Sequence, residues 1–173
     1  MSEAAPIIVT ALLSDADFAW ADALRRAHFP AGRNLAPAHV TLFHHLPPSA
    51  LGEVRGLARE AARSAAPRAW LAGPMRLNSG VAFRIDSPEL EALRDRMAVA
   101  LRGLLIPQDQ ATWRPHLTIQ NKAEPRDAAA LYERLSHGFS PRPVAIAGLG
   151  LWRYRGGPWE RMARHMFRGG RPG

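Results

Sequence analysis

The sequence contains no cysteine and almost no lysine. Because none of its 173 residues is cysteine, disulfides, thiolate metal sites and a cysteine nucleophile are excluded. Lys122 is the only lysine, so arginine supplies the other 22 of the 23 basic residues. No apolar run approaches the roughly 20 residues that a membrane-spanning helix needs. The first residues carry Glu3 and no basic residue, unlike a secretory signal. We therefore expect a cytoplasmic protein that is not attached to a membrane.

Length and composition are those of a globular chain. Hydrophobic residues make up 47% of the sequence and charged residues 22%. A chain of this length buries about 70% of its unfolded surface, so it can fold without disulfides or structural metal ions. The formal net charge of +8 has two explanations. The arginines are either solvated products of a biased composition, or they create a positive field that attracts polyanions such as RNA and nucleotides. Charge alone does not name the partner.

Strand and helix patterns occur twice in the same order, strand–helix–strand–helix–strand. The expected strands are 7–13, 39–46, 70–77 with a break at 73–74, 81–85, 116–121, 144–154 and 159–167, and the expected helices are 14–28, 51–62, 89–102 and 125–137. The repetition predicts one bilobal domain over residues 1–167, with a flexible tail at 168–173. Its two lobes correspond to approximate repeats at 6–77 and 80–167, each a sheet with helices on one face.

The second strand of each repeat opens with the same pattern of residues. His39-Val40-Thr41-Leu42 and His116-Leu117-Thr118-Ile119 both place a histidine and a threonine at alternate positions. Because strand side chains alternate between faces, each histidine shares a face with its threonine while the apolar pair faces the core. If the two lobes pack as a pseudo-symmetric pair, the open faces form one groove that holds two imidazoles and two hydroxyls.

This arrangement of side chains suits phosphodiester chemistry that uses no metal. An imidazole with a pKa near ~6.5 can be a base or an acid at neutral pH. One histidine can therefore deprotonate a water or hydroxyl that attacks phosphorus, while the other protonates the departing oxygen. The threonine hydroxyls can donate to the non-bridging phosphate oxygens.

The motif pair resembles the signature of the two-histidine (2H) phosphoesterase superfamily, in its 2′-5′ RNA ligase-like and cyclic phosphodiesterase branch. The resemblance implies an α+β fold, bilobal and pseudo-two-fold, with mostly antiparallel sheets lining a central cleft and helices on the outer faces. It implies hydrolysis of 2′,3′-cyclic phosphates of RNA ends or nucleotides without metal or cofactor. It also implies that His39 and His116 are the catalytic acid and base, and that Thr41 and Thr118 bind the phosphate.

Four further residues near the motifs are expected as possible substrate ligands: Phe43, Gln120, Trp113 and Arg114. Phe43 follows the alternation of the first motif and could stack on a base or pack in the core. Gln120 follows the second motif in phase and could hydrogen-bond a ribose or phosphate, or be an ordinary strand residue. Trp113 and Arg114 precede His116 on a loop that can carry an aromatic ring and a cation to the cleft.

Two other groups of residues carry alternative interpretations. His44 and His45 adjoin the first motif, but neighbouring strand residues face opposite ways, so no metal site is expected. A hairpin around Trp152 and Trp159 carries Arg153 and Arg155. It is either a basic-aromatic surface for nucleic acid or a set of cross-strand aromatic pairs.

The leading hypothesis is therefore a metal-independent cyclic phosphodiesterase, and two alternatives stay open. One is 2′-5′ RNA ligation, which is the same chemistry reversed. The other is an RNA- or nucleotide-binding module without catalysis. The expected partner is RNA or a nucleotide that carries a cyclic phosphate, and no protein partner is implied.

Overall fold

The computed structural model describes residues 5–168, so residues 169–173 of the predicted tail lie outside the described residues. Its strands are β1 Ile7–Leu13, β2 Val40–Leu46, β3 Arg68–Leu77, β4 Gly80–Asp86, β5 His116–Gln120, β6 Arg142–Arg153 and β7 Glu160–Met166. Its helices are α1 Asp15–His28, α2 Leu51–Ala61, α3 Pro88–Ala100, α4 Pro107–Gln110 and α5 Pro125–Ser136, with a 3₁₀ turn η1 at Pro48–Ala50.

The longer elements begin where the sequence supplies caps. The Ser14 hydroxyl accepts the Asp17 N–H at the start of α1, and the Ser87 hydroxyl accepts the Leu90 N–H at the start of α3. The sequence did not predict α4 or η1. Each is about one turn long and begins at a proline, so neither carries enough residues to show helical periodicity.

All pairs among the named strands are antiparallel, and six of the strands close into a ring. The order is β1-β2-β5-β4-β3-β6, and β6 pairs again with β1, while β7 lies outside the ring on β6. The ring is narrowest between β2 and β5, where a single residue pair, Val40 with Leu117, joins the strands. This junction brings together the two segments that carry the repeated motif.

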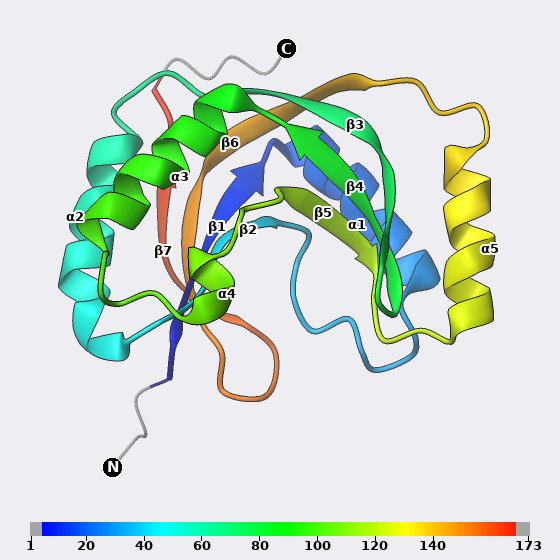
Figure 1. Ribbon diagram of the computed structural model, residues 1–173, viewed down its shortest axis with the longest axis horizontal. Helices are drawn as coiled ribbons and strands as arrows, with labels where there is room; N and C mark the ends of the chain where they lie inside the picture. The colour runs from blue at the N-terminus through cyan, green and yellow to red at the C-terminus, as the bar shows by residue number, and fades with distance from the viewer. Residues whose placement is uncertain (1–4, 169–173) are drawn as a thin grey trace.

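Helices cover the outer faces of two lobes (Figure 1). One lobe has α1 and α5 packed on β5, β4 and β3, and the other has α2 and α4 beside β7 and β2. The ring of Trp20 in α1 lies 5.4 Å from that of Phe83, whose cross-strand partner is Leu117. Helix α1 therefore covers the face of β5 that carries Leu117, which is opposite to the face of His116 and Thr118. The expected α+β fold with two lobes and antiparallel strands is confirmed.

The lobes draw elements from both halves of the chain. Helix α1 comes from the first predicted repeat, 6–77, but packs on β5 of the second, 80–167. Strand β6 from the second repeat likewise pairs with β1 of the first. The duplication itself stays a prediction, while the packing shows that each lobe needs both halves to bury its core. No helix among residues 5–168 is long and apolar enough to cross a membrane.

Candidate active site

The two His-x-Thr motifs face each other across the junction of β2 and β5. Because the strands are antiparallel and Val40 is paired with Leu117, extending the register by one residue places His39 opposite Thr118 and Thr41 opposite His116. Residues opposite each other on one face have Cβ atoms about 4.5–5.5 Å apart. All four of these side chains are half-buried, whereas the alternating positions Val40, Leu42, Leu117 and Ile119 are fully buried. Two imidazoles and two hydroxyls therefore share one face of the sheet.

Both imidazoles are held by the same kind of hydrogen bond. The Nδ1 atom of His39 lies 2.6 Å from the Pro37 carbonyl oxygen, and that of His116 lies 2.7 Å from the Arg114 carbonyl oxygen. A carbonyl can only accept, so Nδ1 must carry the proton in each ring. In the neutral ring Nε2 is then unprotonated, and it is the nitrogen left to act on a substrate.

The surroundings of His39 favour its neutral form. Its ring centroid lies 4.5 Å from that of Trp159, on the connection that leads into β7. Burial lowers the pKa of His39 to about 4, and positive charge on Arg25, His116 and His44 acts in the same direction. The hydrogen bond to the Pro37 carbonyl opposes this change without overcoming it. His39 is therefore unprotonated at neutral pH.

A buried arginine on each side supports the backbone of the motif strands. Arg25 of α1 donates to the carbonyl oxygens of Thr118 at 2.8 Å and Ala36 at 3.0 Å. Arg94 of α3 donates to the Leu42 carbonyl oxygen at 2.9 Å. Both side chains are almost fully buried, and burial lowers the pKa of Arg25 to about 10. These guanidiniums are buried and bind backbone carbonyl groups of the motif strands, so they are not placed to touch a substrate.

Trp113 and Arg114 connect the approach to the second motif with the first. The indole N–H of Trp113 donates to the Thr41 carbonyl oxygen at 3.0 Å, and its half-buried ring packs against Arg94. The carbonyl of Arg114 anchors His116, while its side chain is exposed beside the motif. Of the two, only Arg114 has a side chain that can reach an anion, because the indole N–H of Trp113 is already bonded to the Thr41 carbonyl oxygen.

The expectation that Phe43 shares a face with His39 and Thr41 is wrong. Thr10 of β1 is paired with Thr41, but Val9 is paired with Phe43, so β2 has one extra residue at this point. This β-bulge ends the alternation, and Phe43 becomes fully buried together with Leu42. The guanidinium carbon of Arg94 lies 4.7 Å from the centre of the Phe43 ring. Phe43 is thus a core residue and has no free face for a base.

A second bulge turns Gln120 away from the motif face. Ala82 of β4 is paired with Thr118 and Val81 with Gln120, which again leaves one extra residue in the motif strand. The Gln120 side chain is almost fully buried, and its amide donates to the His28 carbonyl oxygen at 3.2 Å. Gln120 therefore points toward the end of α1.

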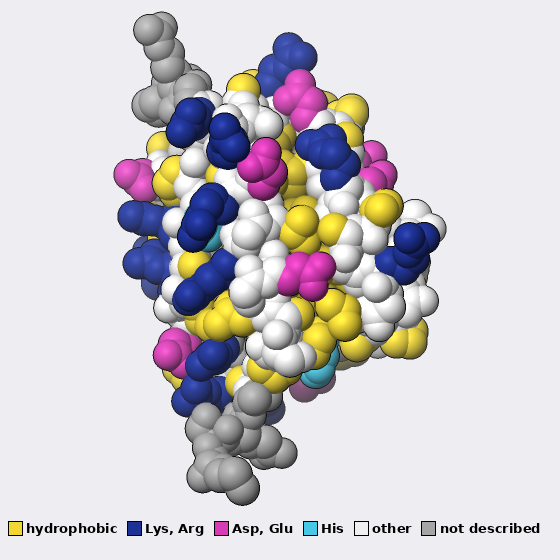
Figure 2. All heavy atoms as spheres, turned by 90° about the vertical axis from the view of Figure 1, so that its left-hand side faces the viewer, with side chains coloured by type: hydrophobic (Ala, Val, Ile, Leu, Met, Phe, Trp, Pro, Cys, Tyr) yellow, Lys and Arg dark blue, Asp and Glu magenta, His cyan; other side chains and the backbone are white. Residues whose placement is uncertain are grey.

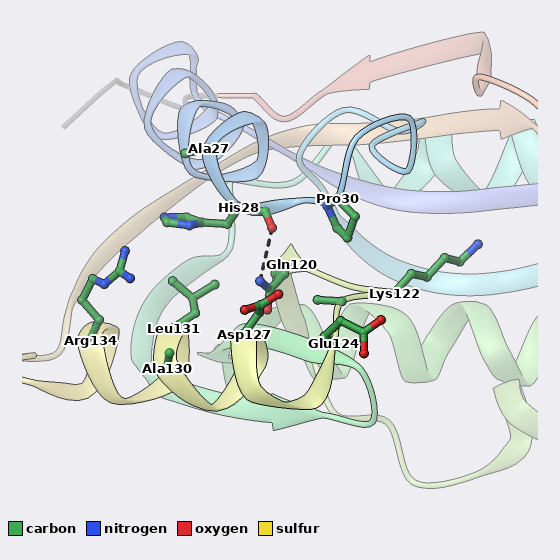
Figure 3. A pocket seen from close by; sticks show the side chains of 11 residues that line it. Ala27, His28, Pro30, Gln120, Lys122, Glu124, Asp127, Ala130, Leu131 and Arg134 are labelled. Atoms are coloured by element: carbon green, nitrogen blue, oxygen red, sulfur yellow. Dashed lines mark hydrogen bonds between the residues drawn. The ribbon is translucent and has the colours of Figure 1, made fainter.

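Gln120 lies at the base of a hollow of about 350 Å³ between α1 and α5 (Figure 3). Asp127 and Arg134 of α5 face it from below and His28 from above, and Lys122 lies at one end. Burial and the charge of Arg134 lower the pKa of His28. The hollow mixes charges of both signs and lies on the α1 side of β5. It is separate from the face that carries His116 and Thr118.

A histidine–aspartate pair adjoins the first motif. The Nδ1 atom of His44 lies 2.8 Å from the Asp109 carboxylate, which also accepts the backbone N–H groups of His44 and His45. Burial alone would raise the pKa of Asp109, but these hydrogen bonds outweigh it and the net change is downward. The pair fastens α4 to β2. No group of three or more potential metal ligands occurs within residues 5–168.

Sequence reasoning missed the supporting residues more than the motif itself. The two buried arginines could have been noticed, because each stands on the apolar side of its helix. Arg25 follows Ala21 by four residues, and Arg94 follows Leu90 by four. Asp109 could not have been noticed, because its partners lie 65 residues away in the chain. The sequence placed Trp159 only in an aromatic hairpin, because its contact with His39 arises from the three-dimensional packing of two distant segments. Trp152, by contrast, is buried and donates to the Thr10 hydroxyl.

Comparisons with known proteins identify the family of the chain. The family model described as "2′-5′ RNA ligase superfamily" matches residues 13–158. The chain belongs to this superfamily. The match covers both motifs, so the predicted resemblance to 2H phosphoesterases is confirmed. No curated protein sequence matches the chain.

Three solved structures have a fold similar to that of this chain. TT0787 of Thermus thermophilus has a TM-score of 0.66 at 20% identity, over 95% of this chain and 98% of its own. LigT of E. coli complexed with 3′-AMP has a TM-score of 0.58 at 18% identity, over 96% and 99%. A structure titled only as a phosphoesterase has a TM-score of 0.56 at 20% identity, over 95% and 99%. At these identities the likeness establishes the fold.

Proposed function

We propose that this 2H protein is a metal-independent phosphodiesterase that hydrolyses 2′,3′-cyclic phosphates of RNA ends or nucleotides. The observation that carries the proposal is the pair of imidazoles on one sheet face, each anchored through Nδ1 and each opposite a threonine hydroxyl. The similar E. coli LigT was crystallised with 3′-AMP and with ATP, which supports a nucleotide ligand for this face.

In the proposed reaction His39 is the base and His116 the acid. The unprotonated Nε2 of His39 takes a proton from a water molecule as its oxygen attacks phosphorus. The bond between phosphorus and one ribose oxygen breaks, and that oxygen receives a proton from Nε2 of His116, whose ring must carry a proton on both nitrogens when this step begins. Thr41 and Thr118 donate to the non-bridging oxygens, and the side chain of Arg114 can add a cation. The lowered pKa of His39 favours this division of roles.

The proposal is tested by turnover of a 2′,3′-cyclic mononucleotide in the presence of EDTA. We expect a phosphomonoester product, and either His39→Ala or His116→Ala should reduce the rate by at least about a hundredfold, in line with acid–base catalysis. Arg126→Ala is the matched control, because Arg126 is exposed on α5 away from the motif face. Full activity in both histidine variants, or a complete need for added metal, would contradict the proposal.

Ligation of a 2′-hydroxyl is the reverse of the same proton transfers, so the same residues would serve it. An assay with two oligonucleotides, one ending in a cyclic phosphate, separates the two directions through the length of the product. A non-catalytic RNA-binding module predicts binding without turnover of either substrate. The double substitution of His39 and His116 should then leave RNA affinity unchanged.

A further inference from the structure

Strand β7 is an edge strand that is surrounded by arginines. Among the described residues it pairs only with β6, and its outer side carries no further strand. Arg161 and Arg164 lie on β7, while Arg55 and Arg59 lie one turn apart on the neighbouring α2. All four side chains are exposed. We call these four residues the β7 rim.

The rim carries positive charge on both faces of β7, because Arg164 shares the row of Gly150 while its neighbour His165 shares the row of Leu149 on the opposite face. Helix α2 packs beside β7, and the charges of Arg59 and Arg55 contribute to lowering the pKa of His165, which places both arginines near this strand. Figure 2 views the left-hand side of Figure 1, where α2 and β7 lie, and shows basic side chains in a column along one edge with a histidine between them. Within residues 5–168, none of the four rim arginines forms an ion pair, and the nearby Glu160 is paired with Arg155. The rim therefore has positive charge available for an anionic partner.

The register of the sheet joins the rim to the catalytic face. Thr41 is paired with Thr10, Thr10 with Gly150 and Gly150 with Arg164, so the four residues form one row on one face. With strands about 4.8 Å apart, the Cα atoms of Thr41 and Arg164 are separated by roughly 14 Å. A register shift in β7 also places Arg161 opposite Trp152, on this same face. Two rim arginines thus point to the side where the catalytic residues lie.

The backbone path to the site is short as well. Trp159, whose ring contacts His39, immediately precedes β7. At a rise of about 3.3 Å per residue, Arg161 lies about 7 Å and Arg164 about 16 Å further along the chain. These spacings match a few successive phosphates of an extended nucleic-acid strand better than a single nucleotide.

We infer that the β7 rim binds the sugar–phosphate backbone of a single-stranded RNA whose cyclic-phosphate end occupies the site at His39 and His116. The inference rests on the proposed function for the identity of that end, and it makes an oligonucleotide rather than a mononucleotide the preferred substrate. Its grounds are the positive charge of the four arginines, which is unpaired among the described residues, and the continuity of Arg161 and Arg164 with the motif face, from which the RNA strand would pass over the β7 edge to the two rim arginines of α2. Such contacts read the backbone and not the base, so the rim gives affinity without sequence preference.

The test reverses two rim charges, one on each element, in the variant Arg59→Glu/Arg164→Glu. Its matched control is Arg126→Glu/Arg134→Glu, which makes the same change in net charge on α5, at the opposite end of the molecule in Figure 1. The substrates are a 12-nucleotide RNA with a 2′,3′-cyclic phosphate and the corresponding cyclic mononucleotide. We expect the ratio of their kcat/KM values to fall at least about tenfold in the rim variant and to stay within twofold in the control.

Binding is measured separately from catalysis with a labelled 12-nucleotide RNA that ends in a hydroxyl. The slope of log affinity against log salt should become shallower by about 1.4 in the rim variant, because each lost phosphate contact removes about 0.7. The charge-neutral variant Arg59→Gln/Arg164→Gln should show a smaller loss of affinity in the same direction, which guards against misfolding of the reversed form.

The outcomes separate the two proposals. Loss of RNA affinity in the rim variant, with no turnover of any cyclic phosphate by the native chain, supports the rim and rejects the phosphodiesterase. Equal loss in the rim and α5 variants shows an effect of net charge alone and overturns the rim. Unchanged RNA affinity in the rim variant also overturns the inference. So does a native protein that does not bind the RNA but binds anionic phospholipid vesicles, if the rim variant has lost that vesicle binding.

Discussion

The lowered pKa of His39 makes the stability of the protein depend on pH in a predictable direction. As the pH falls below about 6.5, the unfolded chain takes up a proton at this residue, whereas the folded chain does so only near a pH of about 4. Protonation therefore stabilises the unfolded state relative to the folded state across this window. The contribution of His39 is fully present above pH 6.5 and is lost as the pH falls to about 4.

The size of the effect follows from the two pKa values. A difference from 6.5 to about 4 corresponds to at most about 3–4 kcal/mol of unfolding free energy, at about 1.4 kcal/mol for each pKa unit, and most of it is reached by pH 4. The substitution His39→Asn removes the titration and keeps an amide N–H that can donate to the Pro37 carbonyl in place of Nδ1. The free energy of unfolding of the native chain, minus that of the variant, should therefore decrease by up to about 3 kcal/mol between pH 7.5 and pH 4.

Urea denaturation followed by tryptophan fluorescence at four pH values measures this difference. Burial also lowers the pKa values of His28 and His165, but both residues are common to the two proteins and their contributions cancel. A free-energy difference that stays constant from pH 7.5 to pH 4 would refute the reasoning. Nitrogen NMR gives an independent check, since the His39 ring should carry its proton on Nδ1 and titrate well below pH 6.5.

Three further substitutions test how the site is held together, each by thermal or urea unfolding. Asp109→Asn removes a carboxylate that accepts two backbone N–H groups and an imidazole, and should cost about 2 kcal/mol. Gly80→Ala should lower the free energy of unfolding by about 3 kcal/mol or more, because the new Cβ would collide with the carbonyl oxygen of Gln120. Its control is Gly52→Ala, whose Cβ would meet no atom within 4 Å, so this change should not destabilise the protein. Arg25→Met leaves two carbonyl acceptors without their donor and should cost about 2–4 kcal/mol, with a larger KM in the cyclic phosphate assay.

The four motif residues could be predicted from sequence because they depend on a local rule. Alternation along a strand places His39 with Thr41 and His116 with Thr118, and that rule needs no knowledge of the neighbouring strands. The same rule failed two residues later in both motifs. At Phe43 and Gln120 each strand contains a bulge, and a bulge is defined by the register of the partner strand, which the sequence of the motif does not contain.

Long-range packing also explains why the lobes were harder to predict than the elements. The hydrophobic periodicity of α1 fixes which residues it buries, but any apolar sheet face would satisfy it. Helix α1 packs on β5 of the other half, where Arg25 reaches the Thr118 carbonyl across 93 residues of chain. Such a contact needs the three-dimensional arrangement of both halves, so no pattern within one half could have indicated it.

The two motifs are alike in sequence and in anchoring, and yet their histidines are not equivalent. Each ring donates through Nδ1 to the carbonyl two residues before it, so the motif alone gives no reason to call one the acid. What differs is the packing around His39, where Trp159 covers the ring and Arg25 places a positive charge nearby. Because the pKa of a group depends on burial and charge, the neighbours of His39 are the basis of the role that we propose for it. The substitution Trp159→Ala should therefore raise the pKa of His39 toward its ordinary value, which NMR titration of the His39 ring would measure.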